Sequence, residues 1–176
     1  EKAGSTQPIA ESYKALEDFV VGKTIEELED LLASNSPEEM VDVVSGSTLV
    51  DNYGYVESFV LAAKEVSATG EANPNLTSVK MGRSNFAAHG DKAFAVAVVA
   101  MDGDTIVGAS IDEFQFLNPE QDGVVPVPNS DGAFGEGIPE DVVLASKVDS
   151  NEAYSANMAE KAGSTQPIAE SYKALE

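Results

Sequence analysis

Hydrophobic residues recur at helical spacing through residues 7–66. A row beginning after Thr24 predicts an amphipathic helix whose first turn holds two glutamates. Its members are Ile25, Leu28, Leu31 and Leu32. A second helix is predicted over about 51–66, with two adjoining apolar rows. These rows are Tyr55, Phe59, Ala62 and Val66, and beside them Tyr53, Val56, Val60 and Ala63.

From Val79 onward the pattern becomes that of strands. Residues 92–101 and 105–117 flank the turn-forming residues Asp102, Gly103 and Asp104, so we expect a β-hairpin. The first strand is apolar on both faces, which favours a central position in a sheet. A Gly/Pro-rich loop follows over 118–139. Because helices and strands are segregated in sequence, the expected class is α+β, with a small antiparallel sheet packed against helices.

A segment rich in Gly, Pro and Asn separates the two patterns. Residues 67–78, SATGEANPNLTS, lack apolar periodicity and form the best linker in the chain. We therefore divide the chain into a helical part over 1–67, a linker over 68–78 and a β-containing part over 79–176.

One segment occurs twice. Residues 1–17, EKAGSTQPIAESYKALE, return unchanged as residues 160–176, an offset of 159 residues. One interpretation is a tandem repeat of about 159 residues seen in rotated register, in which 1–67 belongs to one repeat and 79–176 to the next. The other is a permuted or duplicated arrangement. In either copy we expect a helix, capped in the second by Ser164 or Thr165 with Pro167 in its first turn.

The tandem interpretation leads to an expectation about the two copies. Identical segments prefer identical surroundings, so we expect them to occupy equivalent sites in two different domains. The sequence has neither an initiator Met nor a signal-peptide pattern, and we expect it to be an internal piece of a longer chain.

Charge and cysteine content narrow the function classes. The formal net charge is −21, which disfavours nucleic acid and anionic membrane surfaces as partners. The absence of Cys excludes disulfides, iron–sulfur clusters and thiolate zinc sites. No apolar run reaches the roughly 18–20 residues that a membrane span needs.

The stretch DVVSGSTLVD, residues 42–51, is the candidate for chemistry. Ser45, Gly46, Ser47 and Thr48 are expected to form a turn just before the helix over 51–66, where free backbone N–H groups and the helix dipole favour a phosphate. Gly46 would let the backbone approach closely. Asp42 is placed to hold a metal or orient a hydroxyl, which suggests phosphoryl chemistry on Thr48. The alternative is an ordinary capped helix start after a turn.

The order Asp-x-x-Ser-Gly-x-Thr resembles the flavinylation motif of FMN-binding domains. In that family a flavin transferase links FMN to the final Thr through a phosphoester. The stretch VKMGRSNFAAHGDKAFAVAVVAMDGDTIVGASIDEFQ is similar to the entry and hairpin of the family domain. The stretch from Val142 through the duplicated segment to Leu32 is similar to the region before the motif in the extracellular pheromone-lipoprotein type. The family usually has Ala at the position of Ser47, and often Ser or Thr at that of Val50.

The resemblance implies a covalent FMN on Thr48, with its surroundings made by other residues of the motif. These are Asp42, Ser45, Gly46, Ser47 and Leu49. Further candidates for contact with the flavin are Tyr53, Asn129, Phe134 and Lys147. Tyr55 and Phe86 are aromatic residues that stack on a flavin or belong to the core. For His89 two interpretations stay open, a neighbour of a flavin or haem and a solvated side chain. Residues 129–137 could hold Ca²⁺ but lack EF-hand spacing. No metal site is assigned.

The implied function is electron transfer and not self-sufficient enzymatic catalysis. FMN would do the redox chemistry, and the protein would anchor and screen it. The resemblance places such a protein outside the cell or on its surface. Its partners would be a flavin transferase, redox donors and acceptors, and identical repeats arranged head to tail in an array or filament. The alternative is an acidic surface fibre or stalk without a redox cofactor.

Overall fold

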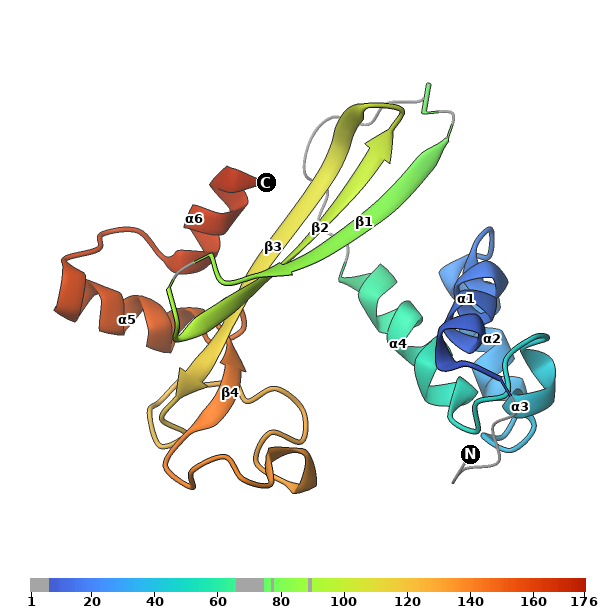
Figure 1. Ribbon diagram of the computed structural model, residues 1–176, viewed down its shortest axis with the longest axis horizontal. Helices are drawn as coiled ribbons and strands as arrows, with labels where there is room; N and C mark the ends of the chain where they lie inside the picture. The colour runs from blue at the N-terminus through green and yellow to red at the C-terminus, as the bar shows by residue number, and fades with distance from the viewer. Residues whose placement is uncertain (1–6, 66–74, 77, 89) are drawn as a thin grey trace. The chain divides into compact units, whose positions relative to one another are not determined.

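The computed structural model describes residues 7–65, 75, 76, 78–88 and 90–176. The chain divides into two compact units, Glu1–Ser67 and Ala68–Glu176, which we call the helical unit and the sheet unit (Figure 1). The division falls where the composition changes. Most of the proposed linker, and His89, lie outside the described residues.

The helical unit contains four helices around one apolar core. They are α1 (Ile9–Val20), α2 (Ile25–Ser34), α3 (Met40–Val43) and α4 (Asn52–Lys64). The core consists of Leu16, Leu28, Met40, Val44, Val56 and Val60, all at most 5% exposed. All four helices and the turn after α3 contribute to it, so this core positions the candidate motif.

Local signals account for α2. Thr24 Oγ1 accepts a hydrogen bond from the Glu27 N–H, and the Glu27 carboxylate accepts one from the Thr24 N–H. This capping box satisfies two N–H groups that a helix start leaves without partners. The expected cap at Thr24 is confirmed, and α4 lies within the range expected for the second helix.

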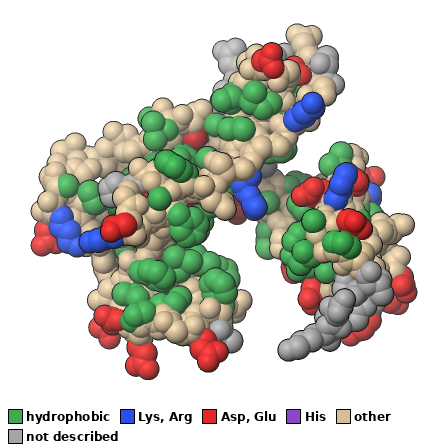
Figure 2. Space-filling model, viewed as in Figure 1, with side chains coloured by type: hydrophobic (Ala, Val, Ile, Leu, Met, Phe, Trp, Pro, Cys, Tyr) green, Lys and Arg blue, Asp and Glu red, His purple; other side chains and the backbone are tan. Residues whose placement is uncertain are grey.

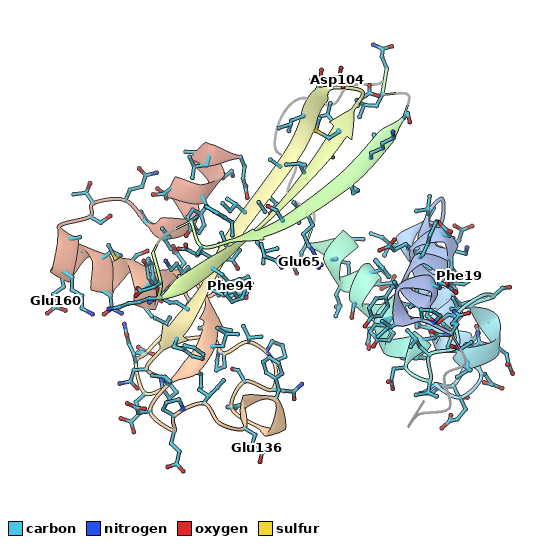
Figure 3. All side chains as sticks on the ribbon, viewed as in Figure 1. Phe19, Glu65, Phe94, Asp104, Glu136 and Glu160 are labelled. Carbon is cyan, nitrogen blue, oxygen red and sulfur yellow. The ribbon has the colours of Figure 1, made fainter. Side chains whose placement is uncertain are left out.

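The sheet unit contains a four-stranded antiparallel sheet in the order β1-β2-β3-β4. The strands are β1 (Val79–Phe86), β2 (Ala93–Asp102), β3 (Thr105–Leu117) and β4 (Val143–Ser146). The hairpin between β2 and β3 turns at Gly103 and Asp104, at the labelled tip in Figure 3. Strand β2 lies between β1 and β3, so its predicted central position is confirmed. The class is α+β, as expected.

The two faces of the sheet differ in their cover. On the face of Ala95, Ile111 and Glu113, helix α6 (Ile168–Leu175) lies against β3. Because side chains alternate along a strand, Phe94 and Phe114 lie on the opposite face, where their rings stack with centroids 5.4 Å apart. Phe94 remains 41% exposed there (Figure 3). An apolar strand therefore occupies a central position without being buried on both sides.

The C-terminal part of the sheet unit contains α5 (Asn151–Ala162) and α6. Leu117, Ala145 and Tyr154 form a small core, with Ile168 packed at its edge. The expected cap of α6 at Ser164 or Thr165 is wrong, because the N-cap residue is Pro167 and no side chain caps the helix. The Ser164 N–H instead bonds to the Met158 carbonyl, closing the end of α5 after the left-handed Gly163.

The two copies of the duplicated segment both form helices, α1 in the helical unit and α6 in the sheet unit. A repeated fold is not seen, since the two units have different elements. None of the helices in the described part of the chain is long and apolar enough to cross a bilayer. Figure 2 shows acidic side chains on the surface of both units.

Candidate functional site

The motif turn lies between α3 and α4. Asp42 is in α3 and exposed, Val44 is 1% exposed in the core, and Ser45 and Gly46 are exposed. Helix α4 begins only at Asn52. The turn therefore lies just before this helix, as expected, with Asp51 as the N-cap residue and Leu49 and Val50 between Thr48 and the cap.

The expected cradle of free backbone N–H groups, by contrast, is wrong for most of the turn. The N–H groups of Ser45 and Ser47 bond to the carbonyls of Val43 and Val44. The Thr48 N–H donates to Ser12 Oγ at 3.3 Å, and the Leu49 N–H to Ser47 Oγ at 3.4 Å. These four groups serve to fold the turn, so they do not offer a preformed phosphate site.

Two side chains of the duplicated segment secure the turn from one side. Gln7 Nε2 donates to the Gly46 carbonyl at 2.5 Å and to Ser12 Oγ at 2.7 Å. Ser12 is fully buried and accepts the Thr48 N–H. The conformation of the motif thus depends on residues that precede it by more than thirty positions.

Asn52 secures the turn from the other side. Ser47 Oγ donates to Asn52 Oδ1 at 2.7 Å, and Asn52 Nδ2 donates to the Met40 carbonyl at 3.4 Å. Ser47 is 7% exposed and Asn52 fully buried, so both polar groups need these partners. Thr48, by contrast, is half-buried. Hydrogen bonds therefore hold the turn on both sides of Thr48, while the Thr48 side chain stays partly exposed.

Two features of the turn require a glycine at position 46, its backbone conformation and the close approach of α1. Its φ is +88°, a conformation that costs little only for glycine. A Cβ added there would also lie 3.3 Å from the Cβ of Ala15. The close backbone approach that the sequence predicts is therefore to α1 of the same unit.

The remaining candidates of the helical unit play packing roles. Leu49 is half-buried, and Tyr53 packs against the core. Tyr55 meets Tyr13 edge to face, with ring centroids 5.5 Å apart.

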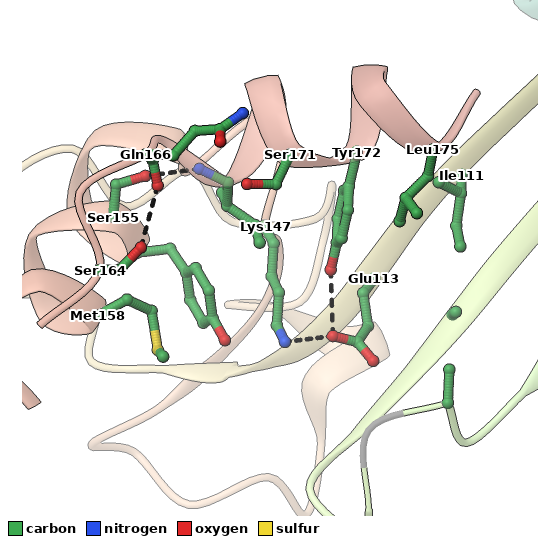
Figure 4. A pocket seen from close by; sticks show the side chains of 14 residues that line it. Ile111, Glu113, Lys147, Ser155, Met158, Ser164, Gln166, Ser171, Tyr172 and Leu175 are labelled. Carbon is green, nitrogen blue, oxygen red and sulfur yellow. Dashed lines mark hydrogen bonds and ion pairs between the residues drawn. The ribbon is translucent and has the colours of Figure 1, made fainter. Parts of the chain in front are cut away.

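In the sheet unit, Lys147 is the candidate with the most unusual surroundings. It is 1% exposed and forms an ion pair with Glu113. Its Nζ also lies 4.5 Å from the centroid of the Tyr154 ring. The Glu113 carboxylate accepts a second hydrogen bond, from the Tyr172 hydroxyl at 3.2 Å (Figure 4). Burial, together with this carboxylate, raises the pKa of the Tyr172 phenol well above its usual range.

The group lines a cavity of about 340 Å³ between β3, α5 and α6. Its volume is at the lower end of the roughly 300–1,000 Å³ of ligand pockets. Met158, Gln166 and Ser171 contribute to the wall (Figure 4). Because the Glu113 carboxylate neutralises Lys147, the cavity combines a closed ion pair with an aromatic ring and apolar walls.

Asn129 and Phe134 do not line this cavity. Asn129 is exposed in a left-handed conformation with φ of 64°, and Phe134 is 65% exposed. Among the described residues, no group of three or more Asp, Glu or His side chains is placed to hold a metal ion.

Motif reasoning missed the residues that organise both sites. In the helical unit these are Gln7, Ser12 and Asn52, and in the sheet unit Glu113, Tyr154 and Tyr172. The duplicated segment was the signal for three of them, because it contains Gln7 and Ser12 in one copy and Tyr172 in the other.

Fold and site together define an α+β protein with a supported Ser-Gly-Ser-Thr turn in one unit and a cavity with a buried ion pair in the other. Comparison with protein-family models, with curated proteins and with solved structures found no match to this chain.

Proposed function

We propose that the protein is an electron-transfer flavoprotein that carries FMN covalently on Thr48. The observation that carries the proposal is the Asp-x-x-Ser-Gly-x-Thr turn, in which Ser12 and Asn52 hold the backbone while Thr48 stays partly exposed. A modifying enzyme needs a hydroxyl on an ordered, reachable turn. The turn meets that need, although its N–H groups are engaged.

Attachment requires a donor with a leaving group on the FMN phosphate, and FAD is such a donor. Thr48 Oγ1 would form a bond to the FMN phosphorus, the bond from that phosphorus to the bridging oxygen would break, and AMP would leave. The hydroxyl proton would pass to a base supplied by a flavin transferase. Bound FMN supplies reversible one- and two-electron redox chemistry.

The residues of this chain have distinct parts in the proposal. Thr48 anchors the cofactor, and Gly46 and Ser47 set its direction. Asp42, exposed in α3, is available to the transferase. Because a covalent link prevents loss by dilution, it suits a protein outside the cell, where donors and acceptors exchange electrons with it. Successive identical units would then form a multi-flavin array.

The test is co-expression with a flavin transferase, followed by peptide mass mapping. We expect the peptide that contains Thr48 to gain the mass of FMN less water. Thr48→Ala should abolish the gain, Thr48→Ser should retain part of it, and Thr165→Ala, at an exposed threonine in the other unit, should leave it unchanged.

Asp42→Ala should reduce modification at least about ten-fold while costing no more than about 1 kcal/mol in folding, because Asp42 is exposed. Asp51→Ala is its control, since Asp51 makes no side-chain cap bond. An unmodified Thr48 in transferase-exposed wild-type protein would refute the proposal and favour the acidic stalk.

A further inference from the structure

The two edges of the sheet differ in how they end. Strand β4 has four residues, and Pro126 bridges to Ala145 on its outer side. The Val127 N–H bonds to the Leu144 carbonyl at 2.8 Å, which closes this edge further. Strand β1 forms the other edge, has eight residues, and among the described strands pairs with β2 alone (Figure 1). An edge of that length offers its outward N–H and C=O groups to a further strand.

The side chains of β1 are exposed although several of them are large and apolar. Val79 is 49% exposed, Met81 69% and Phe86 71%. The adjoining strand β2 is apolar from Ala93 to Met101. A strand added beside β1 would therefore cover apolar side chains on both faces of the sheet, and burial of these side chains would stabilise it.

The same edge is the basic part of an acidic chain. Residues 79–101 contain three of the ten bases, Lys80, Arg83 and Lys92, but only one of the 31 acids, Asp91. Arg83 is the only arginine of the chain. Both cations of β1 are exposed, and neither forms an ion pair with another described residue. Because charges more than about 8 Å away are screened at physiological ionic strength, this local surplus favours carboxylates at β1.

The spacing of the two cations defines what a partner strand must carry. Side chains alternate along a strand, so Lys80 shares one face of β1 with Phe86, and Arg83 shares the other with Met81. A strand beside β1 has the same alternation, so two carboxylates three positions apart would meet both cations. Arg83 can also bind a carboxylate through two parallel hydrogen bonds.

We propose that β1 is a docking edge for an extended acidic segment of a partner protein, which adds to the sheet as a fifth strand. Backbone hydrogen bonds to β1 supply the affinity. Two acidic residues three positions apart, with apolar residues beside Met81 and Phe86, supply the specificity. The added strand is antiparallel, like every other pair in this sheet. The docking does not rest on the flavin proposal, and its test uses no flavin.

The test is fluorescence anisotropy of a labelled synthetic peptide, VTTETVEV, titrated with the full-length chain. Paired antiparallel to residues 79–86, this peptide places its two glutamates beside Lys80 and Arg83. We expect saturable binding, which Arg83→Gln should weaken at least about three-fold. Lys14→Gln is the matched control, because it removes the same charge from an exposed position of the helical unit, and it should leave binding unchanged. The peptide VTTKTVKV should not bind.

N-methylated peptides separate strand addition from simple charge attraction. Successive residues of a strand direct their N–H groups to opposite edges, so methylation of alternate amides blocks one edge only. We expect one of the two alternately methylated forms of VTTETVEV to bind as the parent does and the other to lose binding. Equal behaviour of the two forms, or binding that Arg83→Gln leaves unchanged, would overturn the proposal. So would a lack of saturation up to about 1 mM chain, which would mean that Lys80 and Arg83 serve to keep this edge from pairing.

Discussion

The two copies of the duplicated segment show how far a sequence alone specifies its surroundings. Both copies form a helix preceded by a proline, at Pro8 and Pro167. In the helical unit the segment buries Ser12 and Leu16, whereas in the sheet unit it turns Tyr172 toward the sheet and leaves Leu175 exposed. Local sequence sets the helix and its apolar face, and the neighbouring elements decide how deeply each residue of that face is buried.

The units around the two copies also differ in what holds them together. The helical unit has a core of six buried hydrophobic residues. The sheet unit has a smaller apolar core and places a buried ion pair, Lys147 with Glu113, against the duplicated helix. The comparison makes two predictions about the free energy of unfolding. In the sheet unit it should fall most when a buried charged side chain is replaced, and in the helical unit when a buried apolar side chain is shortened.

The largest expected effect is at Lys147. Lys147→Met leaves the 5% exposed Glu113 carboxylate without its cation, so the sheet unit should lose about 3–5 kcal/mol of unfolding free energy. Urea denaturation measures this loss. Lys14, whose pair with Asp18 lies on the surface of the helical unit, is the control, and Lys14→Met should have no measurable effect.

The second comparison uses the same substitution in both copies. Leu16→Ala should cost the helical unit about 2–5 kcal/mol, because it removes a fully buried side chain. Leu175→Ala should change stability by no more than about 0.5 kcal/mol in dilute solution. Equal costs, measured by denaturation of the two variants, would contradict the difference in burial.

The smallest effect concerns the tyrosine hydroxyl. Tyr172→Phe should cost about 1 kcal/mol at neutral pH, because Glu113 loses a hydrogen bond. The native pKa of Tyr172 is raised, so its phenol binds its proton more tightly in the folded chain than in the unfolded one. The contribution of Tyr172 to the free energy of unfolding should therefore be fully present below the usual phenol pKa of about 10. It should decrease as the pH rises above that value. Tyr172→Phe should flatten this alkaline decline, and an unchanged profile would show that Tyr172 is not its source.

Much of the fold was predictable because its signals are local. Thr24 and Glu27 lie three positions apart and form the expected capping box. The two strand segments flanking the turn at 102–104 predicted the hairpin, and the apolar residues on both faces of the first strand predicted the central place of β2. The expected cap of α6 failed because the Ser164 backbone N–H closes the end of α5, while its hydroxyl donates to the Gln166 carbonyl and so does not accept from the first turn of α6.

The candidate site was predictable only in part, because its partners are distant in sequence. Ser12 lies 36 positions before Thr48, and Glu113 lies 34 before Lys147. No periodicity joins such pairs. The expected phosphate cradle failed because the backbone N–H groups of the turn form hydrogen bonds within the fold. These bonds form because Val44 and Ser47 are buried, and their burial is set by distant parts of the unit.

The most direct measurement is thiol labelling at the two equivalent leucines. The chain has no native Cys, so Leu16→Cys and Leu175→Cys each introduce one thiol in the same local sequence. In dilute full-length protein, position 175 should react as fast as a free thiol. Position 16 should react at least about 100-fold more slowly than position 175, because labelling there requires local opening that costs about 3 kcal/mol. Equal rates at the two positions would contradict the conclusion that the two units bury the same residue of the duplicated segment to different extents.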